Sequence, residues 1–176
     1  MRTVAVIGAG QMGTGIAQTI AQFGMKVLMS DVDLARAEAG KAKIDQALGK
    51  LVGRGKITPD AATAALARIT PVPDYAPMVE AELIIEAATE KEEIKHRIFA
   101  EAGKVLGADA IMASNTSSIP ITRMAVSSPD PARFIGLHFF NPVPVMGLIE
   151  VIPGLATSPE TVARTRAFAE ALSKQE

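Results

Sequence analysis

The stretch GLHFFNPVPV, residues 136–145, contains one of only two histidines in this chain of 176 residues. His138 lies near the end of a β-like run, beside two phenylalanines and two prolines. Such a histidine is either packed in the core or placed at the mouth of a cleft as a general base. Imidazole suits the second role because it titrates at about pH 6.5 in model compounds. These residues alone leave both roles open.

A second stretch, VIGAGQMGTGIAQ, places Gly8, Gly10 and Gly13 at the spacing G-x-G-x-x-G. The first glycine permits a tight turn, the second lets the backbone approach a pyrophosphate, and the third lets a helix pack closely on a strand. The N-terminus of that helix offers unpaired N–H groups to the anion. The motif follows a predicted strand and opens a predicted helix, so it predicts a dinucleotide site that includes Gln11 and Met12.

Asp31 stands at the end of the second predicted strand. An acidic residue there accepts hydrogen bonds from the hydroxyl groups of the adenosine ribose. It favours NAD over NADP because a carboxylate repels the 2′-phosphate of NADP. Arg36 is near enough in sequence to keep NADP open as an alternative.

Short β-branched runs alternate with longer alanine-rich segments along the chain. We expect strands at 3–8, 26–31, 81–87, 110–115, 133–140 and 147–154, and helices at 12–24, 33–55, 58–69, 90–106 and 158–174. This alternation predicts an α/β fold of the Rossmann type, with a doubly wound and mostly parallel sheet. The two helices at about 33–69 form a predicted helical hairpin inserted after the second strand.

The composition excludes several classes of function. A net charge of −1 argues against nucleic acid or an anionic membrane as the main partner. There are no cysteines, and the two histidines stand in unrelated contexts, so we predict no disulfide, thiolate nucleophile or metal site. No apolar run approaches the ~20 residues of a membrane span, and the N-terminus does not resemble a signal peptide. We therefore expect a soluble, cytoplasmic protein.

Three further blocks follow predicted strands: ATEKEEIK (88–95), ASNTSSIP (113–120) and LHFFNPVPVMGLIEV (137–151). With them the chain resembles the N-terminal, NAD-binding domain of the L-3-hydroxyacyl-CoA dehydrogenases, in particular the 3-hydroxybutyryl-CoA dehydrogenase branch, from residue 3 to about 172. The blocks SNTSS, HFFNPVPVM and LIEVI in this order are far more specific than the glycine motif. The resemblance implies an NAD-dependent oxidoreductase that interconverts (S)-3-hydroxyacyl-CoA and 3-oxoacyl-CoA, with a short acyl chain such as 3-hydroxybutyryl.

The same resemblance assigns roles to the catalytic residues. His138 is the expected general base and acid, Glu150 its orienting carboxylate, and Ser117 a hydrogen-bond partner of the substrate oxygen. The chemistry agrees, since a carboxylate on one ring nitrogen fixes the histidine tautomer and stabilises the imidazolium ion. The alternative for His138 and Glu150 is a packed histidine and a surface glutamate.

The resemblance also places Asn115, Ser117 and Asn141 near the nicotinamide, and Glu90 and Lys95 near the cofactor ribose. The first two could instead serve only as turn or cap residues, which both types commonly are. Glu90 and Lys95 could instead belong to a solvated first helical turn.

Other charged residues carry weaker expectations. His96 stands between Lys95 and Arg97 and is expected to be a solvated side chain. Cations of the hairpin could meet the phosphates of CoA, as the hairpin of relatives does, or form a solvated helix face. They are Lys50, Arg54 and Lys56.

The chain departs from the family in length, and we expect residues 1–176 to be the NAD-binding domain alone. The C-terminal helical domain of the family supplies another asparagine, much of the acyl-CoA cleft and the interface of the homodimers. Without it, the chain is expected to bind NAD and to turn over acyl-CoA poorly. Gly147 stands where relatives often have lysine.

Two other functions stay open. A dehydrogenase of a 3-hydroxy acid without CoA, of the gulonate type, shares the same blocks. A non-catalytic module that senses NADH or holds a partner would need the glycine motif but no acid–base pair.

Overall fold

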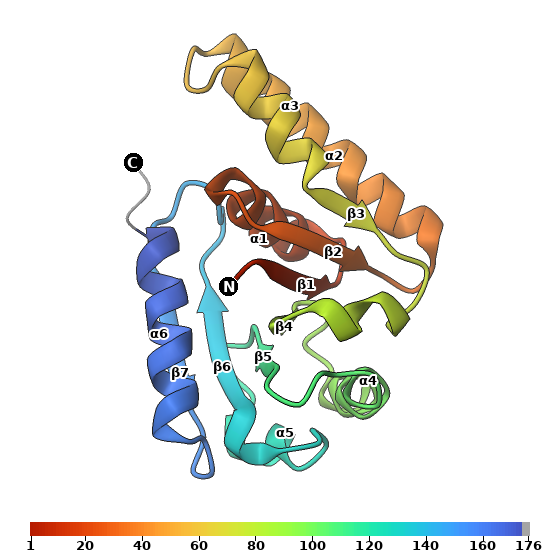
Figure 1. The fold of residues 1–176 in the computed structure, drawn as a ribbon, viewed down its shortest axis with the longest axis vertical. Coiled ribbons are helices and arrows are strands. Elements are labelled where there is room, and N and C mark those ends of the chain that lie inside the picture. The colour runs from red at the N-terminus through yellow and green to blue at the C-terminus, as the bar shows by residue number, and fades with distance from the viewer. Residues whose placement is uncertain (174–176) are drawn as a thin grey trace.

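The central strands are apolar on both faces, as strands covered on both sides must be. β1 (Thr3–Ile7) and β4 (Leu83–Glu86) are buried almost from end to end. In the computed structural model, which describes residues 1–173, they are neighbours in a seven-stranded sheet of order β3-β2-β1-β4-β5-β6-β7 (Figure 1). Strands β1 to β6 are parallel, and β7 is antiparallel to β6. This confirms the predicted doubly wound, mostly parallel fold of the Rossmann type.

The other elements follow the predicted alternation of strands and helices. The remaining strands are β2 (Lys26–Ser30), β3 (Ile69–Pro71), β5 (Ile111–Ser114), β6 (Phe134–Phe139) and β7 (Ile149–Pro153). The helices are α1 (Gln11–Phe23), α2 (Leu34–Gly53), α3 (Pro59–Ala67), α4 (Glu92–Gly103), α5 (Ile121–Ala125) and α6 (Pro159–Ser173). Two 3₁₀ turns, η1 (Ala76–Glu80) and η2 (Pro131–Arg133), precede β4 and β6.

Local residues set the ends of several helices. Helix α1 stops at Gly24, whose φ of 112° is left-handed and therefore favours glycine. Helix α3 begins after Thr58, whose side chain caps the helix, with Pro59 in its first turn. Helix α6 begins after Ser158, whose hydroxyl accepts the backbone N–H of Thr161.

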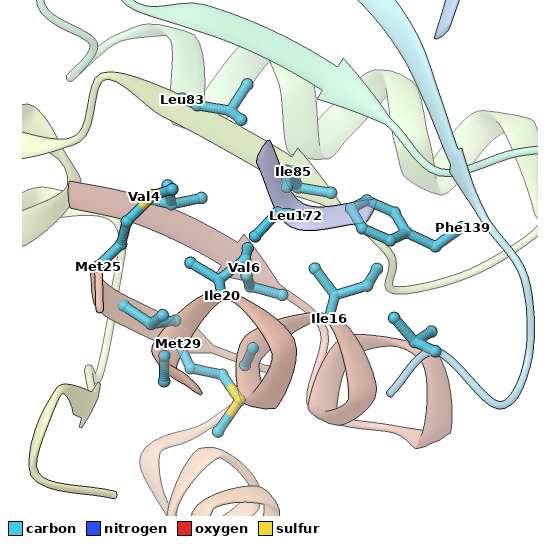
Figure 2. Packing of buried hydrophobic residues seen from close by; sticks show 14 of the residues in the cluster. Val4, Val6, Ile16, Ile20, Met25, Met29, Leu83, Ile85, Phe139 and Leu172 are labelled. Atoms are coloured by element: carbon cyan, nitrogen blue, oxygen red, sulfur yellow. The ribbon is translucent and has the colours of Figure 1, made fainter. Parts of the chain in front are cut away.

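One face of the sheet is covered by α1, α2 and α6. Val6 of β1 meets Ile16 and Ile20 of α1 there, while Phe139 of β6 lies close to Leu172 of α6 (Figure 2). All five side chains are buried. Each such burial stabilises the fold by roughly 1.5–3 kcal/mol, so this layer fixes α1 and the end of β6 against the same strands.

The opposite face is covered by η1, α4 and α5. Ala5 and Ile7 of β1 point to this side, because successive residues of a strand alternate between faces. Phe99 of α4 meets Phe134 of β6 edge to face, with ring centroids 4.8 Å apart. The helix α4 is thereby held beneath the ends of β4 and β5.

The helical hairpin predicted at about 33–69 consists of α2 and α3 and projects from the sheet (Figure 1). Only a narrow stripe of α2 is buried, including Ile44 and Leu48, which join the core beside α1. The outer part of the hairpin therefore presents much of its surface to solvent.

The structure differs from the predicted elements at a few places. Ile69, predicted as the end of a helix, begins the short edge strand β3, where the missing N–H of Pro71 is tolerated. Helix α5 was not predicted, because five residues are too few for a periodic pattern. Position 174 of the predicted last helix lies outside the described residues. Within residues 1–173, no helix is long and apolar enough to cross a membrane.

The close packing of α1 on the turn after β1 predicts a strong effect of Gly13→Ala. A Cβ at Gly13 would lie 1.8 Å from the carbonyl oxygen of Gly8, so α1 must move away from the sheet. We expect the free energy of unfolding to fall by about 1–3 kcal/mol in chemical denaturation. The control is Gly49→Ala in α2, where a Cβ meets nothing within 4 Å. Gly49→Ala should raise the free energy of unfolding by about 0.5–1 kcal/mol. Equal losses of stability in both variants would contradict this account.

Candidate active site

The candidate site lies at the carboxyl ends of the parallel strands. The chain passes from β1 to β2 on one side of β1, whereas β4 pairs with the other side. Such a reversal of strand order opens a crevice between the loops that follow the strands. Most of the predicted cofactor residues lie at or just after the ends of β1, β2, β4, β5 and β6, so the fold brings distant segments to one edge. His138 and Glu150 lie within β6 and β7.

The glycine turn after β1 is packed against its neighbours on one side and open on the other. Gly8 has a φ of 113°, and a Cβ there would lie 2.6 Å from the carbonyl oxygen of Ala87. A Cβ on Gly10, by contrast, would meet nothing within 4 Å. The first residues of a helix have N–H groups without intrahelical partners. The turn therefore forms an open backbone cradle at the N-terminus of α1, which fits a pyrophosphate.

Asp31 is held beside this turn. Its carboxylate accepts the backbone N–H of Ala9 at 2.7 Å and that of Val32 at 2.6 Å. Both hydrogen bonds fix the carboxylate next to the glycine turn, at the end of β2, while it stays partly exposed. Arg36 is exposed on the first turn of α2, where its backbone N–H donates to Asp33. The structure thus places Asp31 directly beside the glycine turn.

A hollow follows the glycine turn and combines several predicted residues from separate elements. It is lined by Gly10, Gln11, Met12, Ala87, Ala88, Thr89, Glu90 and Asn115. The carboxylate of Glu90 accepts a hydrogen bond from the hydroxyl of Thr116 at 3.2 Å. The structure therefore gives Glu90 a fixed neighbour on the loop after β5.

Two asparagines connect this hollow to the end of β6. Asn115 is buried, and its Oδ1 accepts the backbone N–H of Phe139 at 2.8 Å. Asn141 accepts a hydrogen bond from Nε2 of Gln11 at 3.3 Å across the crevice. The peptide bond after Asn141, to Pro142, is cis. These contacts tie the end of β6, just after His138, to residues that line the hollow.

His138 and Glu150 are direct cross-strand partners in the antiparallel pairing of β6 with β7. Nδ1 of His138 lies 3.4 Å from Oε1 of Glu150, within hydrogen-bonding reach. The histidine side chain is 17% exposed and the glutamate 51%. The ring of Phe140 packs edge-on against the imidazole, with centroids 4.5 Å apart. The imidazole is therefore held by a carboxylate and an aromatic ring, while Nε2 is the nitrogen not engaged by Glu150.

Ser117 and Lys95 lie in contrasting environments. Ser117 is exposed on the loop after β5, two residues beyond Asn115. Lys95 is completely buried, with Nζ 2.5 Å from Oε1 of Glu86. This burial rules out the solvated first helical turn that the sequence left open for Lys95. The periodicity of α4 could not reveal it, because Lys95 is the buried member of a charged first turn.

The sequence interpretation missed three residues that organise this edge. Glu86, Ser114 and Thr116 are buried polar residues at or just beyond the ends of β4 and β5. The available signal was a glutamate at the end of the apolar run LII, where a hydrophobic residue would be expected. Buried carboxylates need partners, so that position was a candidate for a buried ion pair.

The second histidine lies in a different cluster. The imidazole of His96 contacts the hydroxyl of Ser127 and lies 3.4 Å from Glu92, and its side chain is 29% exposed rather than fully solvated. Hydrogen bonds from the guanidinium of Arg123 hold the pKa of Glu92 below its usual range. In the described part of the chain, no group of three or more metal-binding side chains comes together.

The parallel sheet, the open glycine turn and the acidic residue after β2 define a Rossmann-type dinucleotide-binding domain. Comparison with known proteins identifies its family. Residues 3–176 match the model for the NAD binding domain of 3-hydroxyacyl-CoA dehydrogenase. The chain belongs to this family.

The relatives are longer than this chain. A 3-hydroxybutyryl-CoA dehydrogenase of Bradyrhizobium diazoefficiens is 45% identical over 175 residues, which are 99% of this chain and 60% of that protein. A probable 3-hydroxybutyryl-CoA dehydrogenase of Deinococcus radiodurans is 47% identical, over 96% of this chain and 60% of its own length. The crystal structure of (S)-3-hydroxybutyryl-CoA dehydrogenase from Ralstonia eutropha superposes with a TM-score of 0.96 at 43% identity, covering 99% of this chain and 62% of the other.

Proposed function

We propose that this chain binds NAD in the crevice beside the glycine turn and supplies the acid–base pair of a 3-hydroxyacyl-CoA dehydrogenase. The reaction interconverts (S)-3-hydroxyacyl-CoA and 3-oxoacyl-CoA, with a short acyl chain such as 3-hydroxybutyryl. One observation carries the proposal: His138 and Glu150 face each other at the end of β6, where the next residue, Phe139, is bonded to Asn115 in the lining of the hollow. A packed core histidine would not need a carboxylate at an exposed edge.

The residues at the carboxyl edge fit a dinucleotide. The open backbone at Gly10 can approach the pyrophosphate, and Asp31 can accept hydrogen bonds from the adenosine ribose. Its carboxylate favours NAD, because it would repel a 2′-phosphate. Asn115 and Asn141 flank the nicotinamide side, and Glu90 lines the hollow between them and the glycine turn.

NAD⁺ held by the glycine turn and Asp31 would supply the acceptor for the hydride of the alcohol carbon. Nε2 of His138 takes the proton of the substrate hydroxyl as the hydride leaves. Glu150 accepts the N–H of Nδ1, so that Nε2 stays unprotonated before the reaction, and it stabilises the imidazolium ion afterwards. Ser117 donates a hydrogen bond to the same substrate oxygen. In the reverse direction the imidazolium returns its proton to that oxygen.

A groove between α1, the hairpin and the 142–145 segment supports CoA as part of the substrate. It encloses about 590 Å³, a volume typical of ligand sites. Its wall carries the exposed cations Lys50, Arg54 and Lys56 beside the apolar Leu51 and Ile57. Cations bind phosphates and an apolar wall suits the pantetheine arm, whereas a small hydroxy acid would need neither.

The chain spans about 60% of the length of the relatives it matches. We propose that the remaining part of such proteins, the helical domain of the family, completes the acyl-CoA cleft and mediates homodimer formation. This chain by itself is then expected to bind NADH and to show slow turnover. The proposal that this chain binds NADH and the other domain completes the acyl-CoA cleft can be tested by calorimetry. NADH and acetoacetyl-CoA are titrated separately and together into this chain and into a longer version.

Gly10→Ala should separate binding from folding. The added methyl group meets no protein atom, so the free energy of unfolding should change by less than about 1 kcal/mol. It projects into the cradle, however, and should weaken NADH binding by roughly tenfold or more, measured by NADH fluorescence. An unchanged affinity would place the dinucleotide elsewhere.

His138→Gln should remove the general base and leave NADH binding unchanged. Single-turnover oxidation of bound NADH by acetoacetyl-CoA should slow by about 10²–10⁴, while the NADH affinity stays as in the unchanged chain. Glu150→Gln should slow the same step less, because it removes only the orienting charge. The control is His96→Gln, which should react normally. If His138→Gln also reacted normally, a non-catalytic binding module would be favoured.

Replacing Lys50, Arg54 and Lys56 together by glutamine should weaken acetoacetyl-CoA binding by roughly tenfold or more, since several phosphate contacts are lost. NADH binding, measured by calorimetry on the same samples, should not change. The control replaces three exposed cations outside the groove, Arg97, Lys104 and Arg166, in the same way. Equal CoA affinity in both triple variants would favour a hydroxy acid without CoA as the substrate.

A further inference from the structure

A fully buried charged cluster lies beneath the proposed cofactor crevice. Glu86, Lys95 and Ser114 each have 0% exposed surface. Oε1 of Glu86 accepts hydrogen bonds from Nζ of Lys95 at 2.5 Å and from the hydroxyl of Ser114 at 2.8 Å. Nζ of Lys95 also lies 3.4 Å from the hydroxyl of Ser114. The three side chains therefore come from β4, α4 and β5 and form one closed set of contacts.

Such a cluster is an expensive way to stabilise a core. Taking two charges out of water costs several kcal/mol for each ion, and apolar residues of similar size often stabilise a fold as well or better. The other residues of β4, Leu83, Ile84 and Ile85, are apolar and pack in the core on both faces of the sheet. A role other than stability is therefore the better explanation of the ion pair.

The free oxygen of Glu86 holds the loop that lines the crevice. Oε2 accepts the backbone N–H of Ala88 at 2.8 Å. The same loop is tied to the central strand, because the N–H of Ala87 donates to the carbonyl of Ile7 at 2.8 Å. Ala88 also lies against the glycine turn, since its Cα would be 2.8 Å from a Cβ on Gly8. The carboxylate thus sets the distance between the loop after β4 and the glycine turn.

The cluster also fixes the start of the loop after β5. Ser114 pairs with Glu86 in the register of β4 with β5, and the N–H of Asn115 donates to the carbonyl of Glu86 at 2.8 Å. Asn115 lines the hollow and accepts the N–H of Phe139. Both loops are therefore tied to one residue: the loop after β4 is bonded to the carboxylate of Glu86, and the loop after β5 to its backbone carbonyl and, through Ser114, to its carboxylate.

We propose that Glu86, Lys95 and Ser114 form a positioning cluster for the dinucleotide. Lys95 acts through Glu86: its ammonium group holds the carboxylate, and the carboxylate accepts the N–H of Ala88 at the wall of the hollow. This inference rests on the proposed NAD binding. It predicts that the cluster contributes to cofactor affinity more than to stability.

The test uses two double variants of the whole chain. Glu86→Leu with Lys95→Met removes both charges and the acceptor for Ala88. Glu86→Gln with Lys95→Met removes both charges but keeps an amide oxygen that can accept the same N–H. We expect the Gln variant to melt within about 5 °C of the unchanged chain, because its amide oxygen can replace the carboxylate as acceptor. The Leu variant leaves the N–H of Ala88 and the hydroxyl of Ser114 without that acceptor, so it should melt at a lower temperature than the Gln variant.

NADH affinity should separate the two variants. The Leu variant should bind NADH roughly tenfold more weakly, and the Gln variant should recover most of that loss. The control is Asp130→Asn with Arg133→Met, which breaks a partly buried pair outside the hollow. It should lower the melting temperature and leave NADH affinity unchanged. Equal NADH affinity of the Leu variant and the unchanged chain would show that the cluster is only structural.

Hydrogen exchange of the unchanged chain keeps the proposal testable if the Leu variant does not fold. The backbone N–H of Ala88 should be protected in the absence of NADH, because it is bonded to a buried carboxylate. Rapid exchange at Ala88 would overturn the positioning role. Absence of NADH binding by the unchanged chain, with Ala88 protected, would instead refute the proposed function and leave the geometry of the cluster intact.

Discussion

The antiparallel pairing of β6 with β7 is the constraint on which the candidate site depends. It places His138 and Glu150, twelve residues apart, directly opposite each other. A slip of one residue would turn one of them to the other face of the sheet, because side chains alternate along a strand. Close packing holds the register, since a Cβ on Gly136 would lie 2.9 Å from Cβ of its partner Ile152. One glycine thus allows the pairing that brings the acid and base together.

The carboxyl edge of the sheet uses charge in two different ways. Asp31 and Glu150 remain partly or largely exposed, where their carboxylates can meet a ligand or orient a side chain that does. Glu86 and Lys95 are completely buried, where they contact each other, Ser114 and the backbone of Ala88. The buried pair supports the backbone of the loop beside the glycine turn, whereas the exposed carboxylates face the solvent.

Membership of the 3-hydroxyacyl-CoA dehydrogenase family and the geometry of the site agree. The proposed dinucleotide cradle and the proposed acid–base pair lie at the same edge of the sheet. The groove along the hairpin carries cations beside apolar surface. The relatives continue beyond the matched region, which is consistent with a cleft shared between two domains.

The sequence by itself determined the alternation of strands and helices, the glycine turn, the hairpin and the candidate pair His138 and Glu150. These follow from local periodicity, glycine spacing and specific blocks, which are properties of short segments. Only the tertiary structure decided that β7 runs antiparallel, that Ile69 joins an edge strand, and that Lys95 is buried against Glu86. Strand direction and the burial of a charge depend on partners distant in the chain, and no local pattern specifies them.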